Sequence, residues 1–243
     1  MPVIAMTREM GSQGKDIAIG LAERLGMHIV HHNLIEHGLS DLLDCDESDV
    51  HRFLEGKLKL LERWSRPQQK KLSNYTVSEV LDLASQGNVI IRGWGSAQIL
   101  RSVAHVICIR VCAPMSQRIE TMMDRMEITD WETAKREVYD NDAAHDRVLK
   151  SLVQTDWRDP LFYDLVINTE NVPIDKGVDF VAQMTALPSF QVTPQSEARL
   201  KELKKEAQVR NALAFGKKSK LDLAFVKTHV DPRSAGRIRD LSK

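Results

Sequence analysis

Short apolar runs recur along the first 187 residues, separated by longer stretches in which apolar positions follow a helical period. The runs are continuous, which is typical of strands buried on both faces of a parallel sheet. They predict strands at Val3–Met6, Met27–Val30, Asn88–Ile91, His105–Val111 and Leu165–Ile167. The sequence therefore predicts a parallel sheet of about five strands.

Helical patterns lie between these runs. Ile17, Leu21 and Leu25 follow a period of about 3.6 residues, which Gly26 ends. The segment TDWE at 129–132 is a capping box that predicts Thr129 as the cap of a long polar helix. A further helix is predicted over Ile174–Met184. Strands that alternate with helices predict an α/β fold in three layers, with helices on both faces of the sheet.

Charge divides the chain into an acidic body and a basic end. The 243 residues include 42% hydrophobic residues, enough for a core, and carry no formal net charge. From Pro194 to Lys243 there are 13 Lys and Arg against 6 Asp and Glu, a net charge of +7, so the preceding residues carry −7. A neutral chain does not suit a protein that coats nucleic acid, whereas the basic end indicates an appended segment.

The sequence predicts a cytoplasmic protein. Arg8 and Glu9 interrupt the first apolar run, so no signal peptide is expected. No stretch approaches the roughly 20 apolar residues of a membrane span. The cysteines form no C-x-x-C pair, which argues against a disulfide or zinc role.

The stretch Met6–Gly26 places a glycine-bearing turn between a strand and a helix, an arrangement that often binds phosphate. A phosphate loop has the pattern G-x-x-x-x-G-K-[ST], whose backbone N–H groups and lysine contact phosphates and whose hydroxyl binds Mg²⁺. Gly14 and Lys15 match, whereas Glu9 replaces the first glycine and Asp16 the Ser or Thr. By spacing alone, the stretch is either a phosphate site or an ordinary turn.

Four segments in order resemble the cytidylate kinase-like family: TREMGSQGKDIAIGLAERLG, NVIIRGWGSAQIL, HVICIRVCAPMSQRIETMMDR and DWRDPLFYDLVINTENVPIDKGVDFV. The resemblance implies a P-loop kinase domain over 1–187, with a helical acceptor-binding insertion at about 38–87 and a lid at about 129–160. Residues 188–194 would be a linker, and 195–243 a small basic C-terminal appendage.

The resemblance also implies a role for each residue of the loop. Backbone N–H groups would hold the phosphates of ATP, and Lys15 would pair with the β and γ oxygens. Asp16 would hold Mg²⁺ through water or merely cap the helix. The implied ATP-binding residues are Gly11, Ser12, Gln13, Gly14, Lys15 and Asp16.

On the acceptor side, the resemblance implies that Arg92 grips a phosphate and that Trp94 stacks on a base. A packing tryptophan and a surface arginine are equally open alternatives. Arg118 is a further candidate for binding the substrate. Arg147 and Arg158 would close from the lid over the transferred phosphoryl group, since guanidinium groups bind phosphate bidentately.

The basic end carries Leu200, Leu203 and Ala207 near helical spacing, which predicts an amphipathic helix. The stretch VRNAL at 209–213 faintly resembles the first helix of a BON domain, which would make the segment a partial module. The alternatives are a helix docked on the kinase body, a disordered tail, or a contact with an unknown partner.

Two classes of function remain open at this point. One is an enzyme that uses ATP and Mg²⁺ to phosphorylate a nucleoside monophosphate, with CMP or dCMP favoured, or another small acceptor. The other is a non-catalytic nucleotide sensor with a kinase fold and a basic interaction tail. The family that the chain resembles has an arginine between two glycines, where Trp94 stands here, and Arg92 precedes the first of these glycines. This displaced arginine and the atypical Asp16 keep the second class open.

Overall fold

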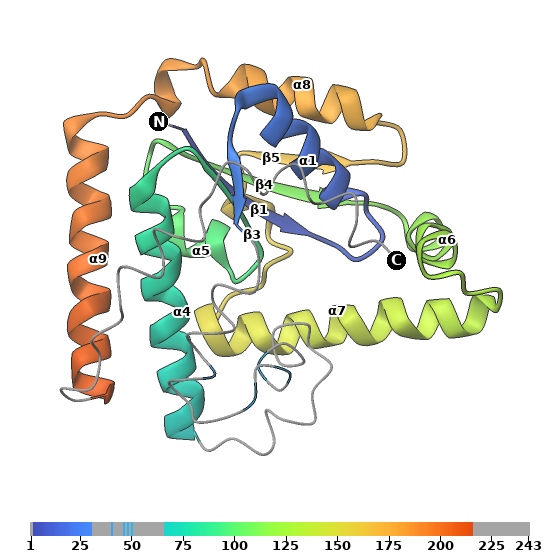
Figure 1. Cartoon of the computed structure of the whole chain (residues 1–243), viewed down its shortest axis with the longest axis horizontal. Helices are drawn as coiled ribbons and strands as arrows, with labels where there is room; N and C mark the ends of the chain where they lie inside the picture. Colours follow the sequence, from blue (N-terminus) through green and yellow to red (C-terminus); the bar gives the residue numbers. More distant parts are fainter. Residues whose placement is uncertain are drawn as a thin grey trace.

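A five-stranded parallel sheet lies at the centre of the protein, in the strand order β2-β3-β1-β4-β5 (Figure 1). This computed structural model describes residues 2–30, 40, 46, 48, 50 and 66–215. The strands are β1 (Val3–Arg8), β2 (His28–Val30), β3 (Val89–Arg92), β4 (Val106–Cys112) and β5 (Leu165–Asn168). The sheet predicted from the apolar runs is confirmed.

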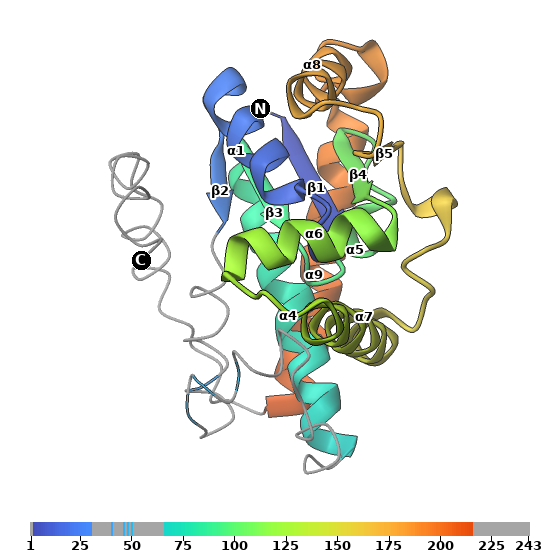
Figure 2. The ribbon, with the colours of Figure 1, turned by 90° about the vertical axis from the view of Figure 1, so that its right-hand side faces the viewer.

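Helices cover both faces of this sheet and make three layers (Figures 1 and 2). The helices are α1 (Gly14–Leu25), α4 (Arg66–Gln86), α5 (Ser96–Leu100), α6 (Met115–Met126), α7 (Trp131–Val153), α8 (Ile174–Met184) and α9 (Pro194–Phe215). Helices α1 and α8 pack together on one face, and α4 and α5 cover the other. Helix α6 packs against α7.

The central strand β1 contributes to the cores on both faces. Ile4 and Met6 pack with Ile17 of α1, whereas Val3 and Ala5 pack on the opposite side. Alternate residues of a strand point to opposite faces, so a strand covered on both sides must be apolar throughout. This explains why the apolar run Val3–Met6 has no polar residue in it.

Helix α7 begins one residue later than its capping box predicted. The cap is Asp130, whose carboxylate accepts a hydrogen bond from the backbone N–H of Thr133 at 2.8 Å. The prediction of Thr129 as the cap was wrong, because Asp130 has the extended backbone of a cap and Asp serves at least as well as Thr there.

Helix α9 docks on α4, which was one of the alternatives for the basic end. Leu200 and Ala207 are buried in the core cluster that contains α4, and Lys204 pairs with Asp82 of α4 at 2.5 Å. Pro194 is the first residue of α9, so the helix begins inside the segment predicted as a linker. The BON-like resemblance stays a prediction.

Some predicted regions lie wholly or partly outside the described residues. In the predicted insertion at about 38–87, the structure describes one element, the helix α4. In the predicted appendage it describes the helix α9. The predicted lid contains α7 and ends where the short 3₁₀ turn at Pro160–Phe162 begins. No helix in the described part of the chain is long and apolar enough to cross a bilayer.

Candidate functional site

The loop between β1 and α1 is packed so closely that two of its positions require glycine. Gly11 has a φ of 78°, and a Cβ there would lie 2.4 Å from the carbonyl oxygen of Arg118. A Cβ at Gly14 would lie 2.8 Å from the Cβ of Arg8. Backbone N–H groups at a helix N-terminus that lack internal partners favour anions. From the end of β1 to the first turn of α1, the N–H groups that donate to no described residue are those of Met10, Gly11, Gln13, Gly14 and Lys15.

Ser12 differs from these residues because its donors are used within the loop. Its side chain is fully buried, and its Oγ donates to the carbonyl oxygen of Glu9 at 2.8 Å. Its backbone N–H donates to the same oxygen at 3.2 Å. Ser12 therefore fixes the shape of the loop, rather than offering its N–H to a phosphate as the sequence predicted.

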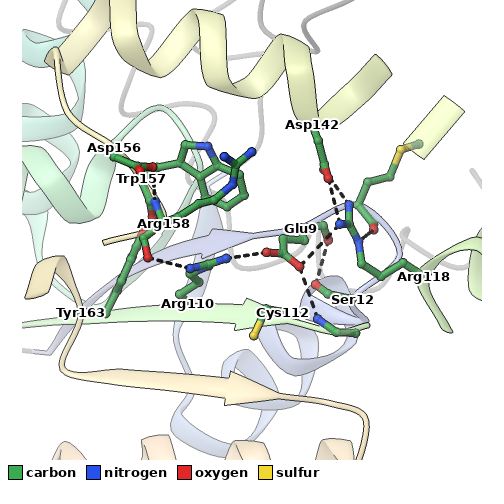
Figure 3. Close-up of polar contacts among 12 residues, drawn as sticks. Glu9, Ser12, Arg110, Cys112, Arg118, Asp142, Asp156, Trp157, Arg158 and Tyr163 are labelled. Atoms are coloured by element: carbon green, nitrogen blue, oxygen red, sulfur yellow. Dashed lines mark hydrogen bonds and ion pairs between the residues drawn. The ribbon is translucent and has the colours of Figure 1, made fainter. Parts of the chain in front are cut away.

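Glu9, which replaces the first glycine of the phosphate-loop pattern, anchors the loop to β4 and α6 (Figure 3). Its carboxylate accepts from Arg110 of β4 at 2.5 Å and from the backbone N–H of Ala113 at 3.4 Å. It also lies 3.6 Å from the guanidinium of Arg118. The carboxylate thus holds the loop from three directions.

Arg118 is a buried structural residue in this arrangement. Its guanidinium donates to both carboxylate oxygens of Asp142 on α7, at 2.9 and 2.6 Å, and to the carbonyl oxygen of Met10 at 2.7 Å (Figure 3). Only 3% of the residue is exposed. Arg118 therefore joins the loop, α6 and α7, and the contact with substrate predicted for it would require these bonds to break.

Arg158 lies at the far end of the predicted lid, beside the buried Trp157 (Figure 3). Its guanidinium pairs with Asp146 at 3.2 Å and stacks 5.2 Å from the centre of the Trp157 ring. Arg110 donates to the carbonyl oxygen of Arg158 at 3.0 Å. Since Arg110 also holds Glu9, the loop and the end of the lid share one arginine.

Lys15 and Asp16 begin α1 in different electrostatic settings. Lys15 is exposed and forms no ion pair with any described residue. Asp16 forms an ion pair with Arg125 at the end of α6, and both side chains are about one-third exposed. The ion pair engages one carboxylate oxygen of Asp16, Oδ2, and the Mg²⁺ role of Asp16 stays a prediction.

Arg92 ends β3 at the carboxyl edge of the sheet. Burial, followed by the nearby charge of Arg8, lowers its pKa to about 10. Its Nε is buried without an acceptor, and the side chain forms no ion pair with a described residue. A buried guanidinium without an acid is costly unless a ligand supplies the negative charge.

Trp94 and Arg147, the other two predicted residues of the acceptor side and the lid, differ in burial. Trp94 is only 5% exposed and packs in the core on the side of α4, so its ring is not presented for stacking on a base. Arg147 lies on an exposed position of α7 and has no partner among the described residues.

Three residues that the sequence analysis did not select contribute to the site: Arg8, Arg110 and His145. Arg8 could have been selected, because it lies between the predicted strand Val3–Met6 and the glycine-bearing loop. His145 lies on α7 with its ring 4.7 Å from that of Trp157. The pKa of His145 is lowered to about 4, first by burial and then by the charges of Arg8 and Arg158, whereas Asp142 and Asp146 act to raise it.

A parallel sheet in this order, with a glycine-bearing loop leading into α1, defines a P-loop kinase fold. The chain belongs to the cytidylate kinase-like family, whose model matches residues 3–171.

Curated relatives agree with this assignment. The chain is 25% identical over 181 residues to a cytidylate kinase of Pyrobaculum aerophilum, covering 73% of this chain and 89% of the relative. The same values hold for a cytidylate kinase of Pyrobaculum islandicum. Among solved structures, an uncharacterized protein from Eubacterium ventriosum matches with a TM-score of 0.59 and 18% identity, covering 76% of this chain and 98% of that one.

Proposed function

We propose that the protein transfers the γ-phosphoryl group of ATP to a nucleoside monophosphate, with CMP or dCMP as the favoured acceptor. The observation that carries the proposal is that Lys15 and Arg92 lack a partner acid among the described residues, at the loop and at the adjacent strand end. Phosphoryl transfer depends mainly on positioning and neutralising phosphate charge, and these two cations are placed for that task.

In this reaction, an oxygen of the acceptor phosphate forms a bond to the γ-phosphorus while the bond from that phosphorus to the bridging oxygen of the β-phosphate breaks. The products are ADP and a nucleoside diphosphate, and no covalent enzyme intermediate forms. The N–H groups of Gly11, Gln13 and Gly14 would bind the donor phosphates, and Lys15 would neutralise the β and γ oxygens.

The acceptor would be held by Arg92 and covered by the lid. Arg147 and Arg158 would approach the transferred group from α7 and the loop after it, and Arg158 would exchange Asp146 for phosphate oxygens. Mg²⁺ would enter with ATP and screen its phosphates; we assign it no direct protein ligand, because Asp16 is paired with Arg125.

The alternative is a nucleotide sensor without activity. Two observations favour it: Asp16 is occupied by Arg125, and Arg118 is occupied by Asp142. A sensor would bind ATP at the loop and signal through the basic C-terminal end to an unknown partner. A kinase for another small acceptor is the third candidate.

The deciding experiment measures ADP release from ATP and Mg²⁺ with each of CMP, dCMP, UMP, AMP and GMP. Turnover confined to CMP and dCMP supports the proposal, and turnover with a different nucleotide corrects the acceptor. ATP binding in calorimetry without turnover on any acceptor supports the sensor. The Lys15→Ala variant provides the background rate.

A further inference from the structure

Arg8 lies on the same face of the sheet as the phosphate loop. Ile4 and Met6 of β1 pack with α1, and the two-residue period of a strand places Arg8 on that same face. The tight approach at Gly14, where a Cβ would lie 2.8 Å from the Cβ of Arg8 and 3.3 Å from its Cδ, agrees with this orientation. Arg8 therefore lies directly against the first turn of α1.

Arg92 lies on the neighbouring strand and the same face. In the parallel pairing of β1 with β3, Met6 stands opposite Arg92, so Arg8 is one same-face position further along β1. The charge of Arg8 also acts on Arg92. Arg8 thus lies against the first turn of α1 on one side and next to the strand that carries Arg92 on the other.

Arg8 is therefore at the edge of the sheet between the loop and Arg92, where a guanidinium group can bind phosphate oxygens bidentately. We propose that Arg8 binds the phosphoryl group in transit, between the donor phosphates at the loop and the acceptor phosphate at Arg92. The proposal rests on the phosphoryl transfer proposed above and assigns it a resident arginine from β1. A guanidinium at this point neutralises the charge of the transferred group.

The pKa of His145 on α7 reports on the net charge at Arg8, with and without a bound phosphate. The groups that act on it are Arg8 of β1, Arg158 of the loop after α7, and Asp142 and Asp146 of α7 itself. A phosphate dianion bound by Arg8 would offset the positive field and raise the pKa of His145. A purely structural role of Arg8, bracing Gly14, predicts no such response.

The first test follows the imidazole resonances of His145 by NMR as a function of pH, in the full chain with and without inorganic phosphate. We expect phosphate to raise the pKa of His145 in the wild type and in Arg24→Met, a control at an exposed arginine of α1. We expect no phosphate-induced change in Arg8→Met. The comparison is made within each variant, because removing Arg8 itself raises the pKa of His145.

An equal phosphate-induced change in Arg8→Met, or none in the wild type, would overturn the proposal. The Arg8→Lys variant keeps the charge if Arg8→Met folds poorly. We expect it to retain a smaller response, because lysine lacks the planar fork that binds phosphate bidentately.

The second test uses turnover and separates this proposal from the proposed function. With the acceptor that supports the highest rate, Arg8→Met should lower kcat by roughly 10²- to 10³-fold while the Kd for ATP changes little. An unchanged kcat would overturn the proposal. If the wild type phosphorylates no acceptor, the proposed function fails, and the phosphate titration alone still decides whether Arg8 forms the anion site.

Discussion

Lys15 and Arg92 differ from Arg110 and Arg118, because neither forms an ion pair with a described residue. Arg110 and Arg118 are held by carboxylates, at 2.5 Å from Glu9 and 2.6 Å from Asp142. Removing a held cation leaves a carboxylate without its partner and destabilises the fold. Removing Lys15 should instead weaken the binding of the nucleotide and leave the stability of the fold unchanged.

We expect Lys15→Ala to weaken ATP binding by about 1.5–3 kcal/mol, roughly 10- to 150-fold in Kd, because phosphate oxygens lose a charged partner. The melting temperature should stay close to that of the wild type. Isothermal titration calorimetry measures the affinity, and Lys135→Ala, at an exposed lysine of α7, is the matched control. Equal affinity in the two variants would show that Lys15 does not contact the nucleotide.

Glu79 should make stability depend on pH. Burial on α4, together with the charge of Asp82, raises its pKa from 4.5 to about 7, although Tyr75 and Lys204 favour the charged form. A raised pKa means that the folded state binds the proton more tightly, so the contribution is complete below pH 4.5 and is lost as pH rises through 7.

Urea unfolding between pH 5 and 8 measures this effect. Stability of the wild type should fall relative to Glu79→Gln as pH rises, by on the order of 3 kcal/mol over the full range. Glu202→Gln, at an exposed glutamate of α9, should follow the wild type. Parallel curves for wild type and Glu79→Gln would show that Glu79 titrates normally.

At the scale of elements, two ion pairs attach α6 to its neighbours, and they differ in burial. The Arg118–Asp142 pair joins α6 to α7 with side-chain exposures of 4% and 17%. The Arg125–Asp16 pair joins α6 to α1 with exposures of 36% and 35%. Exposed pairs contribute little to stability, whereas breaking a buried pair leaves a charge without compensation.

We therefore expect Asp142→Ala to destabilise the protein by about 3 kcal/mol and Asp16→Ala by less than about 1 kcal/mol. Denaturant unfolding of both variants measures the difference. Equal losses would mean that water, or Glu9 at 3.6 Å, takes the place of the Asp142 carboxylate beside Arg118.

At the scale of the whole molecule, the question is whether the part that follows residue 190 can be removed. The sequence predicted a kinase domain over 1–187, a linker at 188–194 and a separate basic appendage. The structure adds that α9 buries Leu200 and Ala207 against the body, while the phosphate loop lies between β1 and α1. Stability and binding should therefore respond differently to truncation.

We expect truncation after residue 190 to cost about 4 kcal/mol and to lower the Tm by about 10 °C, since the apolar contacts of α9 are lost. The Kd for ATP should remain unchanged. Thermal unfolding and ATP titration are compared with a truncation after residue 215, which keeps α9. An unchanged Tm would show that α9 does not stabilise the body, and a weaker Kd would show that α9 acts on the site.

The sequence by itself determined the strands, the loop and the family. Val3–Met6 and the other runs are apolar without interruption because both faces of a central parallel strand are covered, so local pattern was sufficient. Gly14 was identified by the phosphate-loop pattern and Gly11 by the family resemblance, and the structure adds that neither position has room for a Cβ. Ile174–Met184 was predicted with its observed bounds.

Only the tertiary structure decided which charged residues have partners. Arg118 is held by a residue 24 positions away and Glu9 by one 101 positions away, and neither distance is visible in a local pattern. The same holds for Trp94, which packs in the core, and for Asp16, which pairs with the far end of α6. Side-chain identity sets what a residue can bind, but the packing of remote elements sets which partner is within reach.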